Sequence, residues 1–163
     1  MLKYIEVLDR AVMSIINCLV GISAFLLTFI TLLQVLARYI FKVSIGGLGE
    51  LPVYFMMVCI WLTAATAVRK RDHVTVDFIN VFIKNKTVVN TINFIIELIG
   101  LVTTLVFTKL SFNYILTTMK SGNTSPGLRF PLWWLAVIIF ISAVLMSIYY
   151  IVYVGKKFKE VTK

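Results

Sequence analysis

Glu97 is the one acidic residue that lies well inside a long apolar run of this chain, and a carboxylate there could bind a cation or relay a proton. An acid within a membrane-spanning segment is a candidate functional site by default. Two features favour a structural role. A long helix would place Glu97 nearer its cytoplasmic end than its middle, and no acid in another apolar run could complete a cation site. We therefore expect Glu97 to hydrogen-bond to a neighbouring helix or subunit.

The other residue types that could do chemistry are sparse. His73 is the only histidine, and it has no partner at the spacing of metal ligands. Cys18 and Cys59 lie in separate apolar runs without a CxxC or CxxH pattern, so a thiol oxidoreductase is the weakest of three hypotheses. We expect no catalytic residue, no cofactor, no metal site and no substrate-binding residue in this chain.

The composition is that of an integral membrane protein. Hydrophobic residues make up 60% of the 163 residues, whereas a soluble domain has about 45–50%. The net charge of +9 does not indicate a nucleic-acid binder, because the basic residues flank apolar runs instead of forming a polar, aromatic-studded face. Positive flanks are typical of membrane spans.

Four charge-poor runs predict transmembrane helices, at about 11–37, 51–68, 88–119 and 131–154. The run from Leu51 to Val68 has eighteen residues and would extend ~27 Å as a helix, close to the ~30 Å hydrocarbon core. Glu50 and Pro52 suit a helix start, by charge and by geometry. We predict an all-α membrane protein with one domain, 1–163, whose four transmembrane helices form an antiparallel bundle.

Two further segments have amphipathic patterns. Residues 72–84 are too short and too polar to cross a bilayer, and we expect an interfacial amphipathic helix between the second and third spans. Residues 1–10 place Leu2, Ile5 and Leu8 on one helical face, which predicts a short lead-in to the first span.

The distribution of basic residues predicts the orientation. Eleven Lys and Arg residues lie in the N-terminal segment, the loop between the second and third spans, and the tail. Five lie on the other side: Arg38, Lys42, Lys109, Lys120 and Arg129. The positive-inside rule then places both termini in the cytoplasm, in a bacterial inner membrane.

An ordered set of features resembles a known family over nearly the whole chain. It comprises Ala37-Arg38-Tyr39 at the end of the first span, Glu50 before the second, Trp61 within it, an R-x-x-x-H-x-x-x-D run (Arg69, His73, Asp77) and a P-x-W-W run (Pro131, Trp133, Trp134). The set resembles the small membrane subunit, DctQ-like, of tripartite ATP-independent periplasmic (TRAP) transporters. Two departures are Gly46-Gly47-Leu48-Gly49, where members often carry a Trp and a second acid, and Ala64 or Ala65 at a frequent glycine.

The resemblance implies a non-catalytic scaffold. In this family the small subunit pairs with a large membrane subunit, which carries the substrate and sodium sites and moves as an elevator. A periplasmic binding protein delivers an organic acid, such as a C4-dicarboxylate or a sialic acid, for sodium-coupled symport. The partners expected here are these two proteins and membrane lipids.

The residues expected at such contacts fall into two groups. Those expected to face the partner subunit or lipid are Arg38, Glu50, Trp61, Arg69, His73, Asp77, Glu97, Trp133 and Trp134. Those expected to touch the binding protein are Lys42, Ser44, Lys120 and Arg129. The alternative hypothesis is a self-sufficient small transporter that uses Glu97 as its proton or cation site.

Overall fold

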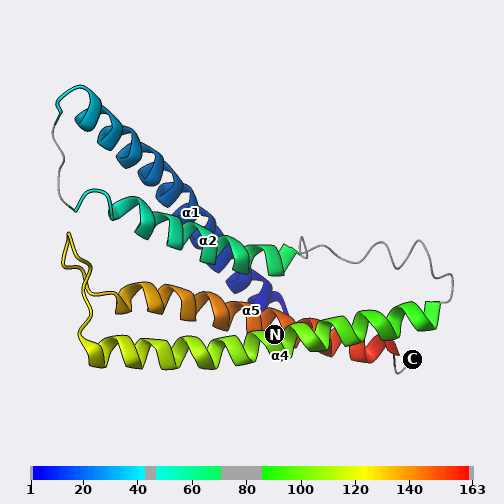
Figure 1. Cartoon of the computed structure of the whole chain (residues 1–163). Coiled ribbons are helices and arrows are strands. Elements are labelled where there is room, and N and C mark those ends of the chain that lie inside the picture. Colours follow the sequence, from blue (N-terminus) through cyan, green and yellow to red (C-terminus); the bar gives the residue numbers. More distant parts are fainter. Residues whose placement is uncertain (1, 43–46, 71–85, 162–163) are drawn as a thin grey trace.

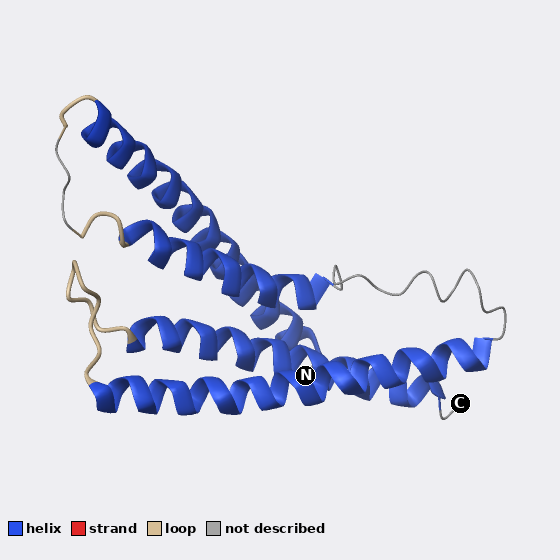
Figure 2. Ribbon diagram, in the orientation of Figure 1, coloured by secondary structure: helices blue, strands red, loops and turns tan. Residues whose placement is uncertain are grey.

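The secondary-structure elements in the described part of the chain are all α-helices. The computed structural model describes residues 2–42, 47–70 and 86–161. The helices are α1 (Leu2–Tyr39), α2 (Leu51–Lys70), α4 (Lys86–Ser121) and α5 (Trp133–Val161) (Figure 1). Loops lead into and out of them, as Figure 2 shows. The interfacial helix predicted at 72–84 lies outside the described residues.

Each of the four helices contains a stretch long and apolar enough to cross a membrane. These stretches are Asp9–Tyr39, Leu51–Lys70, Val88–Ser121 and Trp133–Gly155, with hydropathies of 2.3, 1.9, 1.8 and 2.6. The prediction of an all-α membrane protein with four spans is thus confirmed. α1 runs without a break from Leu2, so the amphipathic lead-in is part of the first helix.

The fourth helix begins later than predicted. Residues 131 and 132 belong to the preceding loop, because the backbone N–H of Leu132 donates to the carbonyl of Asn123 at 3.1 Å. In the same loop the N–H of Ser125 donates to the carbonyl of Phe130 at 2.9 Å. These bonds close a small hairpin from Asn123 to Leu132, and α5 starts only after it.

The helices pack as two hairpins, α1–α2 and α4–α5, which contact each other through α2 and α5. α1 packs against α2, α4 packs antiparallel to α5, and α2 packs against α5 (Figure 1). Small side chains allow the helices to approach closely: Ala65 on α2 and Ala136, Ser142 and Ala143 on α5 are fully buried. The antiparallel bundle that would enclose all four helices stays a prediction.

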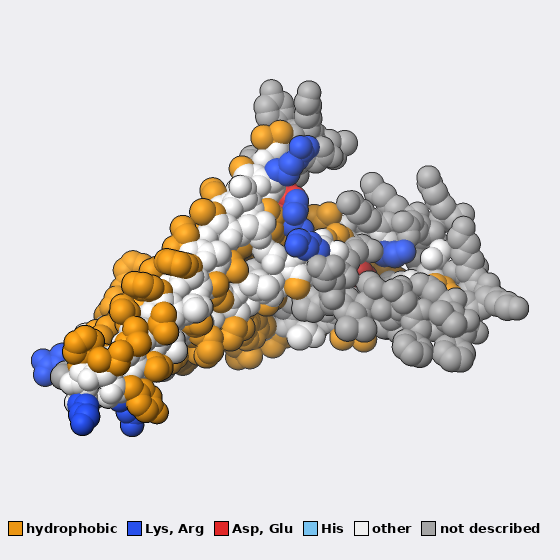
Figure 3. Space-filling model, turned by 90° about the horizontal axis from the view of Figure 1, so that it is seen from above, with side chains coloured by type: hydrophobic (Ala, Val, Ile, Leu, Met, Phe, Trp, Pro, Cys, Tyr) orange, Lys and Arg blue, Asp and Glu red, His pale blue; other side chains and the backbone are white. Residues whose placement is uncertain are grey.

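The outer surface is strongly apolar. Large hydrophobic side chains are exposed on every helix, for example Phe25 at 67% on α1 and Ile99 at 60% on α4. On the face shown in Figure 3 they cover the middle of the helices, and Lys and Arg side chains gather towards the ends. A soluble protein would not expose such a surface, whereas lipid tails or a membrane partner would cover it.

Candidate functional site

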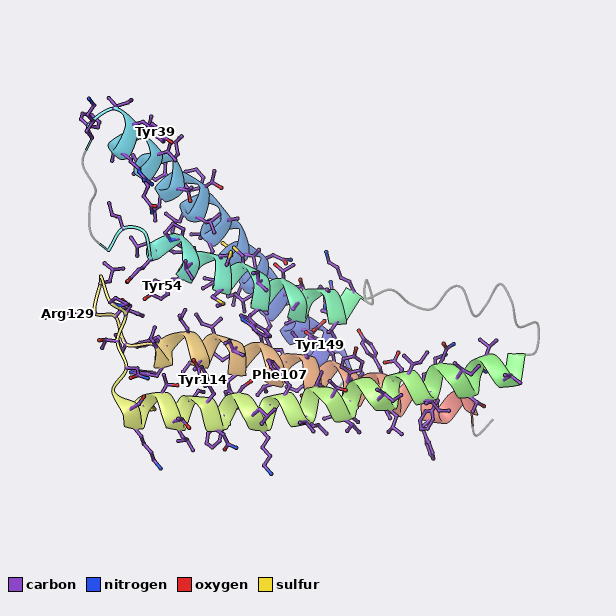
Figure 4. All side chains as sticks on the ribbon, viewed as in Figure 1. Tyr39, Tyr54, Phe107, Tyr114, Arg129 and Tyr149 are labelled. Carbon is purple, nitrogen blue, oxygen red and sulfur yellow. The ribbon has the colours of Figure 1, made fainter. Side chains whose placement is uncertain are left out.

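Asp9 lies at the centre of a polar cluster that joins three helices. Nε and Nη2 of Arg69, at the end of α2, donate to Oδ2 of Asp9 on α1 at 2.9 and 2.6 Å. The hydroxyl of Tyr149 on α5 donates to Oδ1 at 2.7 Å. Both carboxylate oxygens are therefore used, and Figure 4 shows Tyr149 on α5 where α1 and α2 pass it. We call Asp9, Arg69, Tyr149 and Tyr153 the polar clamp.

Tyr153 adds a bond to the backbone of the same helix end. Its hydroxyl donates to the carbonyl of Arg69 at 2.5 Å. The last carbonyls of a helix have no partner within the helix, so Tyr153 satisfies one of those of α2. Arg69 is thus held through its side chain by α1 and through its backbone by α5. The clamp fixes the relative positions of α1, α2 and α5 at this end.

A second contact joins the loops at the opposite end of the helices. The carboxylate of Glu50 accepts the backbone N–H of Gly127 at 2.7 Å and that of Leu128 at 3.1 Å. A hydrogen bond from the Ser125 side chain, together with these two backbone bonds, lowers the pKa of Glu50. Glu50 therefore ties the start of α2 to the hairpin before α5. Asp9 and Glu50 do not meet, because they lie at opposite ends of α2.

Two glycines make this loop contact possible. Gly47 has a positive φ of 88°, and a Cβ on Gly127 would lie 2.7 Å from the Cα of Gly47. The rings of Tyr54 and Phe130, 5.6 Å apart, pack beside the contact. Leu48 of the same loop accepts a hydrogen bond from the side chain of Gln34 at 2.5 Å. α1 and the two loops are thereby connected.

Two contacts hold the middle of the helices together. Trp61 of α2 stacks on Phe107 of α4 with ring centroids 5.2 Å apart. The hydroxyls of Thr108 on α4 and Ser147 on α5 lie 3.1 Å apart. Trp61 was expected at a contact with partner or lipid, and here it is half-buried between helices of its own chain.

The predicted site residues are spread over the whole molecule. Arg38, Lys42, Lys120 and Arg129 are exposed, and Glu97 is half-buried on α4. Trp133 and Trp134 stack at 4.6 Å at the start of α5. His73, Asp77 and Ser44 lie outside the described residues. The structure also brings Glu50 close to the loop that carries Arg129.

The sequence reasoning missed Asp9, Tyr149 and Tyr153. Tyrosines at the end of a span are typical of an interfacial aromatic belt, so their position alone does not indicate bonds to other helices. A signal for Asp9 was present: it shares a helical face, at i, i+4 and i+7, with Met13 and Ile16, which are buried at 4% and 5%. An acid on a buried face needs a cationic partner, and Arg69 ends the helix that packs there.

The hydrogen bonds and the ion pair described above hold elements of the chain together. Among the described residues, no three His, Cys, Asp or Glu side chains come together as metal ligands would. Cys18 and Cys59 are free, and the sulfur of Cys59 lies 3.6 Å from the carbonyl of Val20. The polar clamp and Glu50 join helices and loops of the chain to one another.

The fold and these contacts define a multi-pass helical membrane protein whose polar groups hold its own helices in place. Residues 27–160 match the family model of the DctQ component of tripartite ATP-independent periplasmic transporters. The match spans most of the chain, and the protein belongs to this family, as the ordered motifs indicated. No curated protein matches the sequence.

Proposed function

We propose that this chain is the immobile small subunit of a sodium-coupled TRAP transporter. It pairs with a large membrane subunit, which binds substrate and sodium and moves against it. A periplasmic binding protein delivers the substrate, an organic acid of the C4-dicarboxylate or sialic acid class. The small subunit performs no catalysis and holds no cofactor.

The polar clamp is the observation that supports a scaffold role most directly. A scaffold must keep its helices fixed while its partner moves, and bonds between a carboxylate, a guanidinium and a tyrosine hydroxyl resist relative motion of three helices. Glu50 provides the same restraint at the other end. In this account Arg69 and Glu50 stabilise the subunit itself, and exposed apolar faces remain for the partner.

The charge distribution supports an inner-membrane location with both termini in the cytoplasm. Lys109, counted above among the outer basic residues, lies well inside the α4 span and belongs to neither side. When Lys109 is left out of the count, four basic residues lie on the outer side and eleven on the inner side, so the predicted orientation is unchanged. The clamp then lies at the cytoplasmic end. Lys42, Lys120 and Arg129 lie at the periplasmic end, where they are exposed to the binding protein or to lipid head groups.

Co-purification tests this proposal. The chain is co-expressed with the proposed large permease subunit, extracted in mild detergent and captured by a tag on the small subunit. We expect the large subunit to be recovered in stoichiometric amount. A stable chain that transports solute without any larger partner would contradict the proposal. It would favour the self-sufficient transporter, provided that Glu97→Gln abolishes that transport.

A further inference from the structure

Lys109 is a charged side chain at the middle depth of a membrane span. It lies twelve residues before Ser121, the end of α4, or about 18 Å along the helix. Two contacts give its depth independently. Phe107 stacks on Trp61, the eleventh of the 20 residues of α2. Thr108 contacts Ser147, near the middle of the Trp133–Gly155 span of α5.

The Lys109 side chain points away from the rest of the subunit. The face of α4 that packs on α5 carries Ser111, Ile115 and Thr118, which are buried to between 4% and 9% exposure. Lys109 is exposed on the other face, together with the apolar residues Val102, Leu105, Val106 and Leu116, which are 42–55% exposed. We call these five residues the Lys109 face. Within the described part of the chain, Lys109 makes no ion pair.

Lipid tails cannot satisfy this group. A lysine ammonium has three donors and binds water strongly. Its four-carbon stem does not reach either surface of a ~30 Å hydrocarbon core from the middle. Lysines inside spans accordingly face a protein partner or a water-filled cavity and pair with an opposite charge or with carbonyl groups.

We propose that the Lys109 face is a docking surface for a transmembrane segment of the large subunit that presents a carboxylate at the same depth. This inference rests on the proposed function, since it takes the large subunit as the occupant. The flanking apolar side chains would exclude lipid and water around the ion pair, as residues at the rim of a strong contact do.

Charge complementarity argues against a second copy of this chain as the occupant. Copies that insert in the same orientation place equivalent residues at equal depth. Of the seven acids in the sequence, Asp9 and Glu97 lie within the ranges of the four spans, Glu50 immediately precedes one, and the other four lie beyond the span ends. Asp9 and Glu50 are at span ends. Glu97 lies ten residues, or about 15 Å, along α4 from Phe107, the residue that marks the depth of Lys109. The matching acid must therefore come from another polypeptide.

The test uses the co-expressed complex of both membrane subunits. Lys109→Leu removes a charge from the membrane interior, so insertion of the chain is not impaired, and its membrane level is measured alongside. We expect recovery of the large subunit to fall by at least about tenfold, because an acid of the partner is left buried and unpaired. Lys109→Arg keeps the charge and retains recovery. Lys70→Leu, an exposed lysine at the end of α2, is the matched control.

A photo-crosslinking residue at Val106 gives a second readout, which is independent of affinity. We expect it to crosslink to the large subunit in the intact complex. If the complex forms, but Val106 crosslinks only to lipid and Lys109→Leu leaves recovery unchanged, the docking surface lies elsewhere and the inference is wrong. Crosslinking with unchanged recovery would overturn the pairing with an acid. If no complex forms at all, the proposed function fails and this inference fails with it.

Discussion

The carboxylate of Asp9 and the guanidinium of Arg69 lie 2.6 Å apart, although sixty positions separate the two residues in the sequence. The pair joins the N-terminal part of α1 to the end of α2. Tyr149 brings α5 to the same carboxylate. Three helices are thus held at one point by groups that the chain supplies itself.

Loss of either partner of this pair should destabilise the subunit. Asp9→Ala or Arg69→Ala should lower the free energy of unfolding in mild detergent by about 1–2 kcal/mol, a value discounted for solvent screening of groups that are about one-third exposed. The double variant should cost less than the sum of the two, because the same bonds are lost. Arg10→Ala, an exposed arginine next to Asp9, should have little effect. Strict additivity would show that the pair contributes nothing.

The two clamp tyrosines should act through their hydroxyls. Tyr149→Phe removes the donor to Asp9, and Tyr153→Phe removes the donor to the carbonyl of Arg69. Each should cost about 1 kcal/mol of unfolding free energy. Tyr150→Phe is the matched control, because no hydrogen bond of its hydroxyl is found among the described residues. Equal losses in all three variants would mean that the hydroxyl bonds are not the cause.

The Glu50 contact should depend on pH. The folded state lowers the pKa of Glu50 below its ordinary value of 4.5, through bonds from Ser125, Gly127 and Leu128. The ionised form is therefore stabilised by folding. This contribution is complete above pH 4.5 and is lost as the pH falls through the folded pKa.

Glu50→Gln isolates this effect from that of the other acids. At pH 7 the variant should be less stable than the parent in chemical unfolding. The difference between the two proteins should shrink as the pH is lowered below 4.5. A difference that stays constant over that range would show that ionised Glu50 does not hold the loop.

Gly100 should resist enlargement, because a Cβ there would overlap the ring of Tyr150. Gly100→Ala must displace that ring from the contact between α4 and α5, and we expect a loss of about 1–3 kcal/mol in thermal or chemical unfolding. Gly21→Ala on α1 is the control, because no atom lies within 4 Å of its added Cβ. That variant should be neutral or slightly more stable, since alanine is the better helix former. Similar behaviour of both variants would contradict the close approach.

The spans could be predicted from the sequence because a bilayer determines both the length and the polarity of a helix that crosses it. The predicted ranges 11–37, 51–68 and 88–119 fall within α1, α2 and α4. The predicted fourth span, 131–154, begins two residues before α5. Pro131 and Leu132 are apolar, and that character does not show that hydrogen bonds hold them in the loop. Hydropathy detects where a helix can lie in lipid, and backbone hydrogen bonds decide where it begins.

The contacts between elements could be predicted only in part. Glu50 was recognised as a helix-start acid, but its bonds to Gly127 and Leu128 depend on a loop seventy-seven residues away. Asp9 falls at i+7 from Leu2 and i+4 from Ile5, on the same face of α1, but its partner Arg69 lies sixty positions away in the sequence. Which face of a helix is buried depends on its neighbours, and periodicity is a weak guide in a helix that is apolar all round.

Reconstitution into sealed liposomes tests the central claim most directly. Three preparations are compared for sodium-driven uptake of the organic acid in the presence of the binding protein: this chain alone, the large subunit alone, and both together. The account predicts uptake by the complex and none by this chain alone. Uptake by vesicles that contain only this chain would contradict it.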